Sequence, residues 1–219
     1  MPLILHENID NGEIGLWRIS EEVEELILLS NLSTTETITY NGISALHRKK
    51  EWLATRALLN QLMVGTHTIK YHNDGRPYLD NCPTNISISH STGYIAIMLH
   101  VAYNPGIDIE LISRKVGKVG SRFLSEDEFA VCNEEAEHSN HRMLIHWCAK
   151  EAVYKMVPLS NIEFATDILI TMGNLNEDSG SLHAIFNDKS GPIPITLSYL
   201  IVGEVLMVWG WVDMGSFHN

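Results

Sequence analysis

Residues 147–155 read WCAKEAVYK and predict a helix, because the stretch contains Ala and Glu but no Gly or Pro. Trp147, Glu151 and Lys155 follow one another at intervals of four residues, so they lie on one helical face. An aromatic ring, a carboxylate and an ammonium group therefore share a single stripe. Working outward from this stripe, we expect the helix to cover roughly residues 141–156.

The order of elements around this helix occurs twice in the chain. After the helix, strands are predicted at residues 162–172, 181–186, 194–201 and 205–212, the last two as a hairpin. In the first half we expect a strand at 14–19, a helix at 21–30 capped by Ser20, a loop at 33–42, a helix at 44–64, and strands at 68–72, 76–79, 85–89 and 94–100. The sequence thus predicts an α+β fold of two similar lobes, residues 1–103 and 104–219. Each lobe is a long helix packed on a small, mostly antiparallel sheet, and their junction is the expected place for a site.

The composition excludes several classes of protein. Of the 219 residues, 45% are hydrophobic and 19% are charged, which allows a sizeable core. A net charge of −12 argues against non-specific binding to nucleic acid. Three cysteines without a CxxC motif suit a reducing compartment, and the N-terminus does not resemble a signal peptide. The longest apolar stretch, residues 200–212, is too short to span a bilayer. We expect a cytoplasmic monomer without a membrane segment.

The few basic residues are clustered. Four fall within residues 48–56 and four within residues 114–122, namely Arg48, Lys49, Lys50 and Arg56, then Arg114, Lys115, Lys118 and Arg122. On an acidic chain such clusters indicate local anion sites, although two solvated helix faces would give the same pattern.

The stretch GIDIE, residues 106–110, places two carboxylates on one face of a strand. Asp108 and Glu110 alternate with isoleucines, so their side chains project together about 7 Å apart. A solvated edge strand is the alternative explanation. With Glu151 from the helix, however, the two would offer three oxygen ligands to a hard cation such as Mg²⁺.

The stretch NISISHS, residues 85–91, is the third pattern of interest. Ser87, Ser89 and Ser91 share one face of the predicted strand, and His90 points to the other. A histidine satisfied within the protein is the alternative, whereas the functional interpretation is a phosphate contact from His90 with Ser89 beside it. Arg76 follows a predicted turn directly, in NDGRPYL.

Taken in order, the motifs LATR, GRPYL, SISHS, GIDIE, FLSEDEF and WCAKEAVYK resemble the 4′-phosphopantetheinyl transferase superfamily. The W-x-x-K-E-A form is similar to its Sfp-like subgroup, and the resemblance covers about residues 44–160. It implies two α+β halves related by a pseudo-twofold axis. It also implies Mg²⁺-dependent transfer of 4′-phosphopantetheine from coenzyme A to a serine of an apo acyl or peptidyl carrier protein, with 3′,5′-ADP as the leaving group.

The resemblance also implies roles for the helix and strand residues. Asp108, Glu110 and Glu151 would hold Mg²⁺ on the pyrophosphate, and Glu151 would take the serine proton directly or through a water. Lys155 would reach the pyrophosphate and offset charge on the departing ADP. Trp147 would fix the helix.

Coenzyme A contacts follow from the same resemblance. His90 and Ser89 would contact its phosphates, and Arg48 would meet the 3′-phosphate, with Lys49 and Arg56 as rivals for that role. Arg76 would lie beside the nucleotide. The first helix, EEVEELILLS, lacks the lysines that help to hold adenine in some relatives, which leaves the adenine contacts open.

Several alternatives stay open. Lys150 points about 100° away from Glu151 around the helix, so it is undecided whether it has a direct role. His138, His141 and His146 raise a zinc hypothesis. The chain could also be a non-catalytic coenzyme A-binding or carrier-docking protein that keeps the fold. The basic segment, residues 114–122, is the expected landing surface for an acidic carrier, whose identity the sequence leaves undecided.

Overall fold

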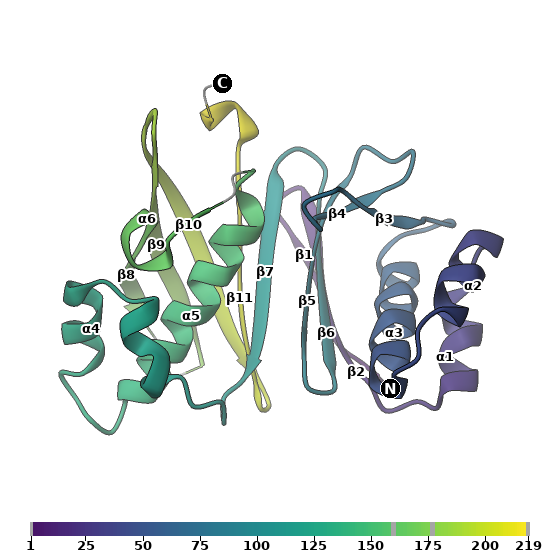
Figure 1. Ribbon diagram of the computed structural model, residues 1–219, viewed down its shortest axis with the longest axis horizontal. Helices are drawn as coiled ribbons and strands as arrows, with labels where there is room; N and C mark the ends of the chain where they lie inside the picture. The colour runs from purple at the N-terminus through teal and green to yellow at the C-terminus, as the bar shows by residue number, and fades with distance from the viewer. Residues whose placement is uncertain (1, 159–160, 176–177, 218–219) are drawn as a thin grey trace. The chain divides into compact units, whose positions relative to one another are not determined.

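The computed structural model describes residues 2–158, 161–175 and 178–217. The chain forms two compact units, residues 1–102 and 103–219, whose elements are labelled in Figure 1. Both are mixed α and β with antiparallel strand pairing, so the predicted α+β class is confirmed. The pseudo-twofold relation between the halves stays a prediction. None of the described helices combines the length and the hydropathy needed to cross a membrane.

The N-terminal unit contains a four-stranded sheet and a long helix. Strands pair in the order β1-β2-β6-β5, and a separate ribbon pairs β3 with β4. The strands are β1 (Leu3–Ile9), β2 (Gly12–Arg18), β3 (Ile69–Tyr71), β4 (Pro77–Leu79), β5 (Asn85–Ser91) and β6 (Tyr94–His100). The helices are α1 (Val23–Ser30), α2 (Thr34–Asn41) and α3 (Leu46–Leu62). The core forms where α3 packs on β2 and β6 through fully buried leucines and alanines, Leu53, Ala54, Ala57 and Leu58.

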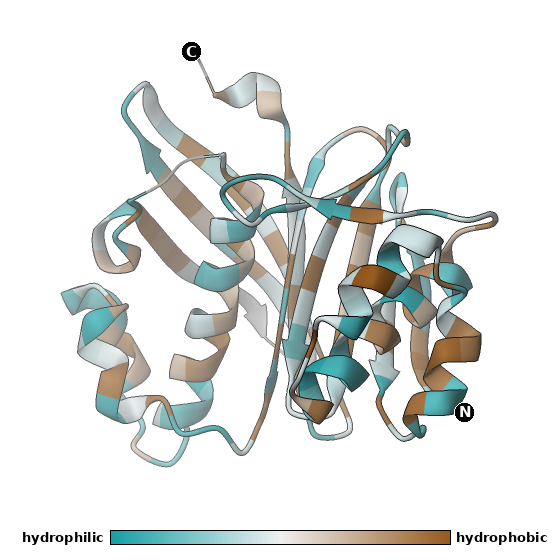
Figure 2. Ribbon diagram, turned by 45° about the vertical axis from the view of Figure 1, so that its right-hand side comes forward, coloured by the Kyte–Doolittle hydropathy of each residue, from teal (hydrophilic) through white to brown (hydrophobic). Residues whose placement is uncertain are grey.

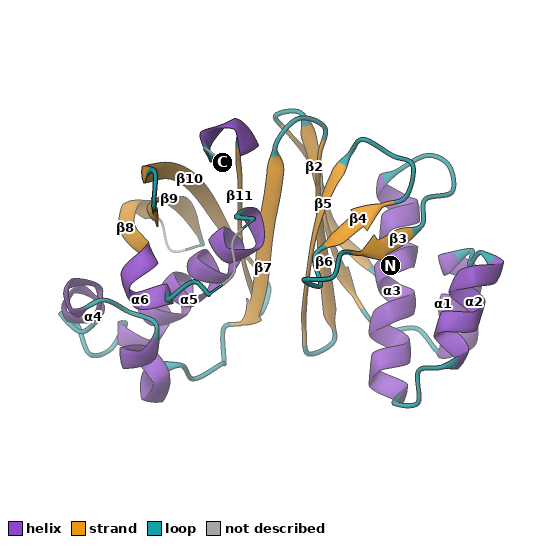
Figure 3. Cartoon of the chain, turned by 45° about the horizontal axis from the view of Figure 1, so that its top comes forward, coloured by secondary structure: helices purple, strands orange, loops and turns teal. Residues whose placement is uncertain are grey.

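The C-terminal unit contains a five-stranded sheet in the order β7-β11-β10-β9-β8. Its strands are β7 (Asn104–Leu111), β8 (Ile168–Leu175), β9 (Ser179–Asp188), β10 (Gly191–Val202) and β11 (Val205–Val212). Its helices are α4 (Glu126–Cys132), α5 (Ser139–Met156) and α6 (Phe164–Asp167), with 3₁₀ turns η1 (Gly117–Arg122) and η2 (Met214–Ser216). Helix α5 runs along one face of this sheet, as Figure 3 shows.

Side-chain alternation explains which face of the C-terminal sheet receives α5. Along β10, Ile193, Ile195 and Leu197 are buried, while Pro194 and Thr196 between them are exposed. The period of two places the apolar set in the core beneath α5. Hydrophobic colour accordingly follows the strands of both sheets in Figure 2.

A glycine allows the closest approach between α5 and the sheet. A Cβ added at Gly106 on β7 would overlap the carbonyl oxygen of Ala152 and crowd Met156, both on α5. Only a residue without a side chain fits there. The first residue of GIDIE therefore brings the carboxylate-bearing strand directly against the helix that carries Glu151.

Three predictions about the elements were wrong. Residues 33–42 are not a loop, because Thr34–Asn41 form α2, started by a capping box between Ser33 and Glu36. The predicted strand at 162–172 begins only at Ile168, and the preceding Phe164–Asp167 are helical. Helix α1 begins at Val23 after Glu22, so Ser20 is not its cap.

The order of elements in the first half also differs from the prediction. The strand β1 was not predicted, and it pairs with β2 ahead of all the helices. The N-terminal unit is therefore not simply a long helix followed by strands. The predicted hairpin at the C-terminus is confirmed, since β10 and β11 pair antiparallel across residues 197–210.

Candidate functional site

Two side-chain contacts place the carboxylates of β7 against the predicted stripe of α5. Lys155 Nζ donates to Asp108 Oδ1 at 2.8 Å, and Trp147 Nε1 donates to Glu110 Oε1 at 3.3 Å. The earlier helix residue meets the later strand residue, so helix and strand run in opposite directions. The structure thus brings Lys155 to Asp108 and Trp147 to Glu110, and the roles predicted for these residues stay predictions.

Lys155 is held by more than its ion pair with Asp108. Its ammonium also donates to the carbonyl oxygen of Ile107 at 2.8 Å, and a quarter of the side chain is exposed. Asp108 is 8% exposed at its side chain, so the pair is desolvated on the carboxylate side.

Burial and the neighbouring Asp108 raise the pKa of the Cys148 thiol well above its ordinary value, which keeps that thiol neutral.

Glu151 lies one turn from both Trp147 and Lys155 on α5. Burial raises the pKa of its carboxyl group, the negative charge of Asp108 raises it further, and the cations Lys155 and Arg114 oppose the shift. The carboxylate is therefore a stronger base than a solvated glutamate. A positive charge placed near Asp108 and Glu151 would relieve their mutual repulsion.

Arg114 is the counter-ion of Glu110. Its guanidinium forms an ion pair with the Glu110 carboxylate, and its Cζ lies 5.1 Å from the centroid of the Trp147 ring. It comes from the turn directly after β7, at the start of the basic segment. The candidate site thus joins two carboxylates of β7 to one cation of α5 and one cation of the following turn.

The donor set suits a hard cation in its chemistry. Asp108, Glu110 and Glu151 supply only carboxylate oxygens, which Mg²⁺ prefers. As arranged, however, no three His, Cys, Asp or Glu side chains in the described part of the chain are close enough to hold a metal ion. The zinc hypothesis gains no support either. His146 is buried, with its Nδ1 2.9 Å from the Arg142 carbonyl oxygen and 3.5 Å from Cys132 Sγ.

A cavity of about 640 Å³ adjoins Glu151. Its apolar wall includes Trp147 and two phenylalanines, and the ring centroid of Trp147 lies 5.1 Å from that of Phe123 and 6.1 Å from that of Phe164. Arg114 and Arg122 from the basic segment also line it, as do residues 162–165. The cavity therefore offers apolar surface with four charged side chains, the cations of Arg114 and Arg122 and the carboxylates of Glu151 and Glu163.

The N-terminal unit has its own cavity, of about 390 Å³, and three predicted residues line it. These are Arg48, Arg56 and His90, beside Tyr71 and Thr55. Arg48 is 57% exposed at its side chain and forms an ion pair with Glu51 at 3.0 Å. His90 lies on the exposed side of β5. Two cations and an imidazole in one cavity suit an anionic ligand.

The Arg56 side chain is more buried than that of Arg48 and makes more contacts within the protein. Its Nε donates to Glu36 Oε1 at 3.0 Å, and its guanidinium lies 3.3 Å from the centroid of the Trp52 ring. Burial lowers its pKa, and Tyr71 and Glu36 partly restore it.

The remaining predicted residues do not line this cavity. Lys49 lies over the Tyr40 ring at 5.0 Å, Arg76 pairs with Asp74 in its own turn, and Ser89 is buried on the face of β5 opposite His90.

Lys150 is excluded from direct contact with a ligand. Its side chain is fully buried, and its ammonium donates to Glu128 Oε2, to the Phe164 carbonyl and to the Ile168 carbonyl at 2.6, 2.8 and 2.6 Å. Glu128 was not among the site residues predicted from the sequence. The signal was present as Ser125-x-x-Glu128, the spacing of a capping box, which the structure contains.

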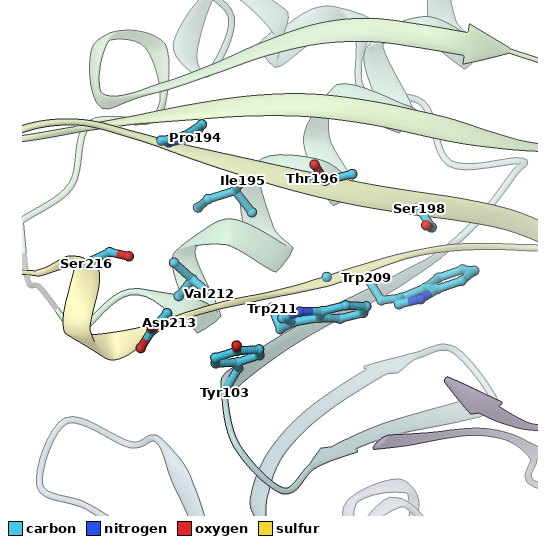
Figure 4. A pocket seen from close by; sticks show the side chains of 11 residues that line it. Tyr103, Pro194, Ile195, Thr196, Ser198, Trp209, Trp211, Val212, Asp213 and Ser216 are labelled. Carbon is cyan, nitrogen blue, oxygen red and sulfur yellow. The ribbon is translucent and has the colours of Figure 1, made fainter. Parts of the chain in front are cut away.

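A further cavity, of about 450 Å³, lies on β10 and β11 and contains no predicted site residue. Figure 4 shows the rings of Tyr103, Trp209 and Trp211 along it, with Asp213 at one end.

Comparison with known proteins adds to this geometry. Residues 104–201 match the family described as the 4′-phosphopantetheinyl transferase superfamily. The chain is similar to the 4′-phosphopantetheinyl transferase AcpT of Escherichia coli K12 and to AcpT of Escherichia coli O157:H7. Each is 30% identical over 115 residues, which is 49% of this chain and 57% of the relative. The chain thus spans little more than half the length of these relatives. The similarity is distant and does not resolve a subgroup.

Proposed function

We propose that this chain is a Mg²⁺-dependent 4′-phosphopantetheinyl transferase. It moves phosphopantetheine from coenzyme A to a serine of an acyl or peptidyl carrier protein and releases 3′,5′-ADP. The observation that carries the proposal is the facing arrangement of Asp108 and Glu110 on β7 with Glu151 and Lys155 on α5. These residues all lie in the region that is similar to the family.

The reaction is a substitution at phosphorus. The serine oxygen forms a bond to the β-phosphorus of coenzyme A, the bond from that phosphorus to the bridging oxygen breaks, and 3′,5′-ADP leaves with the electron pair. The serine proton passes to a base. Because little covalent chemistry is asked of the protein, its task is to position the reactants and to offset charge.

The carboxylates and cations of the site have separate tasks. Asp108, Glu110 and Glu151 are the proposed Mg²⁺ ligands on the chemistry of their carboxylates, and binding would require them to lie closer together than they do in the described structure. The ion would supply charge neutralisation at the pyrophosphate. Lys155 keeps Asp108 oriented through its 2.8 Å contact and offers a partly exposed ammonium to the phosphate oxygens.

Glu151 is the proposed base for the serine proton. Its carboxyl pKa is raised by burial and by Asp108, so its carboxylate binds a proton more readily than an ordinary glutamate. It also lines the cavity in which the acceptor would have to arrive. The transfer takes place directly or through one water.

The cavity beside Glu151 is the proposed place for the pantetheine arm. The arm is largely apolar and carries two amides, which suits a cavity whose apolar wall is formed by Phe123, Trp147 and Phe164 and whose remaining lining includes charged side chains. For the nucleotide, the proposed contacts are Arg48 and His90 in the cavity of the N-terminal unit.

The test is transfer to a panel of apo carriers from fatty-acid, polyketide and peptide synthesis. Each carrier is incubated with the protein, coenzyme A and Mg²⁺, and its mass is measured. We expect one phosphopantetheine group to be added to at least one carrier, and Glu151→Gln to suppress this addition. A chain that binds coenzyme A but modifies no carrier would instead be a binding or docking protein.

A further inference from the structure

We propose that Lys150, acting with Glu128, is a positioning residue that fixes one wall of the cavity beside Glu151 and thereby sets the affinity for a ligand carrying the pantetheine arm. The affinity part of this inference rests on the proposed function. The structural part, a clamp on residues 162–170, does not.

The Lys150 ammonium has three N–H donors, and it donates to three acceptor atoms. One is the Glu128 carboxylate, and the other two are the backbone carbonyls of Phe164 and Ile168. These carbonyls belong to the first residue of α6 and the first residue of β8. A lysine of the helix that bears Glu151 therefore holds both ends of the four-residue helix α6.

The Glu128 carboxylate is equally engaged. Its Oε1 accepts from the Ile170 amide at 2.6 Å, and its Oε2 accepts from the Ser125 amide at 2.8 Å as well as from Lys150. Both side chains are almost wholly buried. The ammonium of Lys150 and the carboxylate of Glu128 thus pair with each other, and their remaining hydrogen bonds go to backbone groups. The network joins α4, α5 and the start of β8.

The segment held in this way forms a wall of the cavity. Ile162, Glu163, Phe164 and Ala165 line it together with Arg114 and Arg122 of the basic segment. Phe164 contacts Lys150 through its carbonyl and packs its ring 6.1 Å from that of Trp147. Lys150 precedes Glu151 directly on α5, so the same turn of helix positions the basic carboxylate and one wall of the cavity that this carboxylate lines.

A buried charge is a costly way to join these elements, because removing either partner leaves the other desolvated and unpaired. The same elements could pack through apolar residues. The ion pair instead fixes the position of two backbone carbonyls, and a cavity that must receive a flexible arm gains affinity when its wall is already in place.

The clamp is tested first by amide hydrogen exchange, which requires no ligand. Lys150→Met removes the ammonium, and Lys189→Met makes the same change at an exposed position of the chain. We expect faster exchange across residues 162–170 in Lys150→Met alone, with β10 and β11 unchanged. Unchanged exchange in 162–170 would overturn the clamp. If Lys150→Met does not fold, Glu128→Gln is measured in its place.

The affinity is tested by calorimetry with two ligands, coenzyme A and 3′,5′-ADP, which lacks the arm. We expect Lys150→Met to weaken coenzyme A binding about tenfold and to leave 3′,5′-ADP binding unchanged. Equal weakening of both ligands, or of neither, would overturn the inference. If the wild-type protein binds neither ligand, the proposed function fails, and the exchange experiment still decides the clamp.

Discussion

Lys155 Nζ lies 2.8 Å from Asp108 Oδ1 and 2.8 Å from the Ile107 carbonyl oxygen, so one ammonium spans two successive residues of β7. This double contact fixes the register between α5 and β7. Glu151, one turn earlier on the helix, is thereby held near Asp108 closely enough for the Asp108 charge to raise its pKa.

The carboxylates on the two elements should be needed for transfer. Asp108→Asn and Glu151→Gln each keep the shape of the side chain and remove its charge. We expect kcat to fall on the order of 10²-fold or more, because a metal ligand or a base is lost. Excess EDTA should stop the wild-type reaction.

The matched control is Glu7→Gln, the same change at an exposed position of β1. It should leave kcat unaltered. Full turnover of the wild-type protein in EDTA would remove the metal assignment, and normal kcat in Glu151→Gln would remove its proposed role as base.

Arg48 should recognise the 3′-phosphate of coenzyme A. It lines the N-terminal cavity with His90 and is largely exposed, whereas Lys49 lies over Tyr40 outside that lining. Arg48→Ala should raise the KM for coenzyme A and discriminate little between coenzyme A and dephospho-coenzyme A. KM is the expected parameter because the contact persists from ground state to transition state.

Lys49→Ala serves as the comparison, since it removes a neighbouring cation of the same helix. It should keep the wild-type preference for coenzyme A. The reverse pattern, with the preference lost in Lys49→Ala and kept in Arg48→Ala, would transfer the role to Lys49.

Gly106 should be intolerant of any side chain. A Cβ there would overlap the Ala152 carbonyl oxygen, so β7 and α5 would have to separate. Gly106→Ala should lower the free energy of unfolding by roughly 1–3 kcal/mol, measured in urea. Gly117→Ala is the control, because a Cβ at Gly117 meets nothing within 4 Å. Equal stability of the two variants would show that the strand adapts.

The pairing of β7 with α5 was predictable because the relevant patterns are periodic. The intervals of four residues on α5 and of two residues on β7 state which side chains share a face, and packing brings those faces together. The interval of two residues also explains why the β10–β11 hairpin could be predicted from the sequence. Neither pattern depends on distant parts of the chain.

The wrong predictions have two causes, a short capping signal that outweighs composition at α2 and a tertiary contact that the local sequence does not state at α6. A Thr-rich stretch reads as loop, yet Ser33 and Glu36 form a capping box that begins α2. Residues 162–172 read as one strand, but α6 is held by Lys150, a residue distant in sequence that donates to its backbone. Which buried partner a lysine will find is set by tertiary packing, so the role of Glu128 could not be read from spacing alone.

Stability should depend on pH through His146. Burial lowers the pKa of this histidine, so it stays neutral in the folded protein at a pH where an unfolded histidine becomes protonated. The unfolded chain then binds more protons, and stability falls as pH drops below about 6.5. The groups facing it, Glu128, Lys150, Cys132 and the Arg142 carbonyl, belong to the same buried region.

The measurement is the free energy of unfolding at a series of pH values between 5 and 8. His146→Asn should flatten the acid side of the profile relative to wild type, whatever its effect at neutral pH. His183→Asn, on the exposed side of β9, should leave the slope unchanged. An unaltered slope in His146→Asn would assign the acid loss of stability to other groups.

The basic segment should govern association with the carrier protein. Lys115 and Lys118 are exposed, and they follow soon after the end of β7. The basic segment that contains them begins at Arg114, which forms the ion pair with Glu110. The charge of the two lysines is opposite to that of the chain as a whole, which carries −12. An acidic carrier would be repelled by most of this surface and attracted here.

Reversing both lysines to Glu should raise the KM for the carrier and weaken its dependence on salt, because exposed charges act mainly on association rate and are screened by ions. The KM for coenzyme A should stay nearly unchanged. Lys189→Glu, an exposed reversal on the β9–β10 turn, is the matched control for Lys115→Glu alone, because each changes the net charge equally. Both KM values are measured at low and high ionic strength. If the carrier KM stays constant, or if the KM for coenzyme A rises equally, the carrier docks elsewhere.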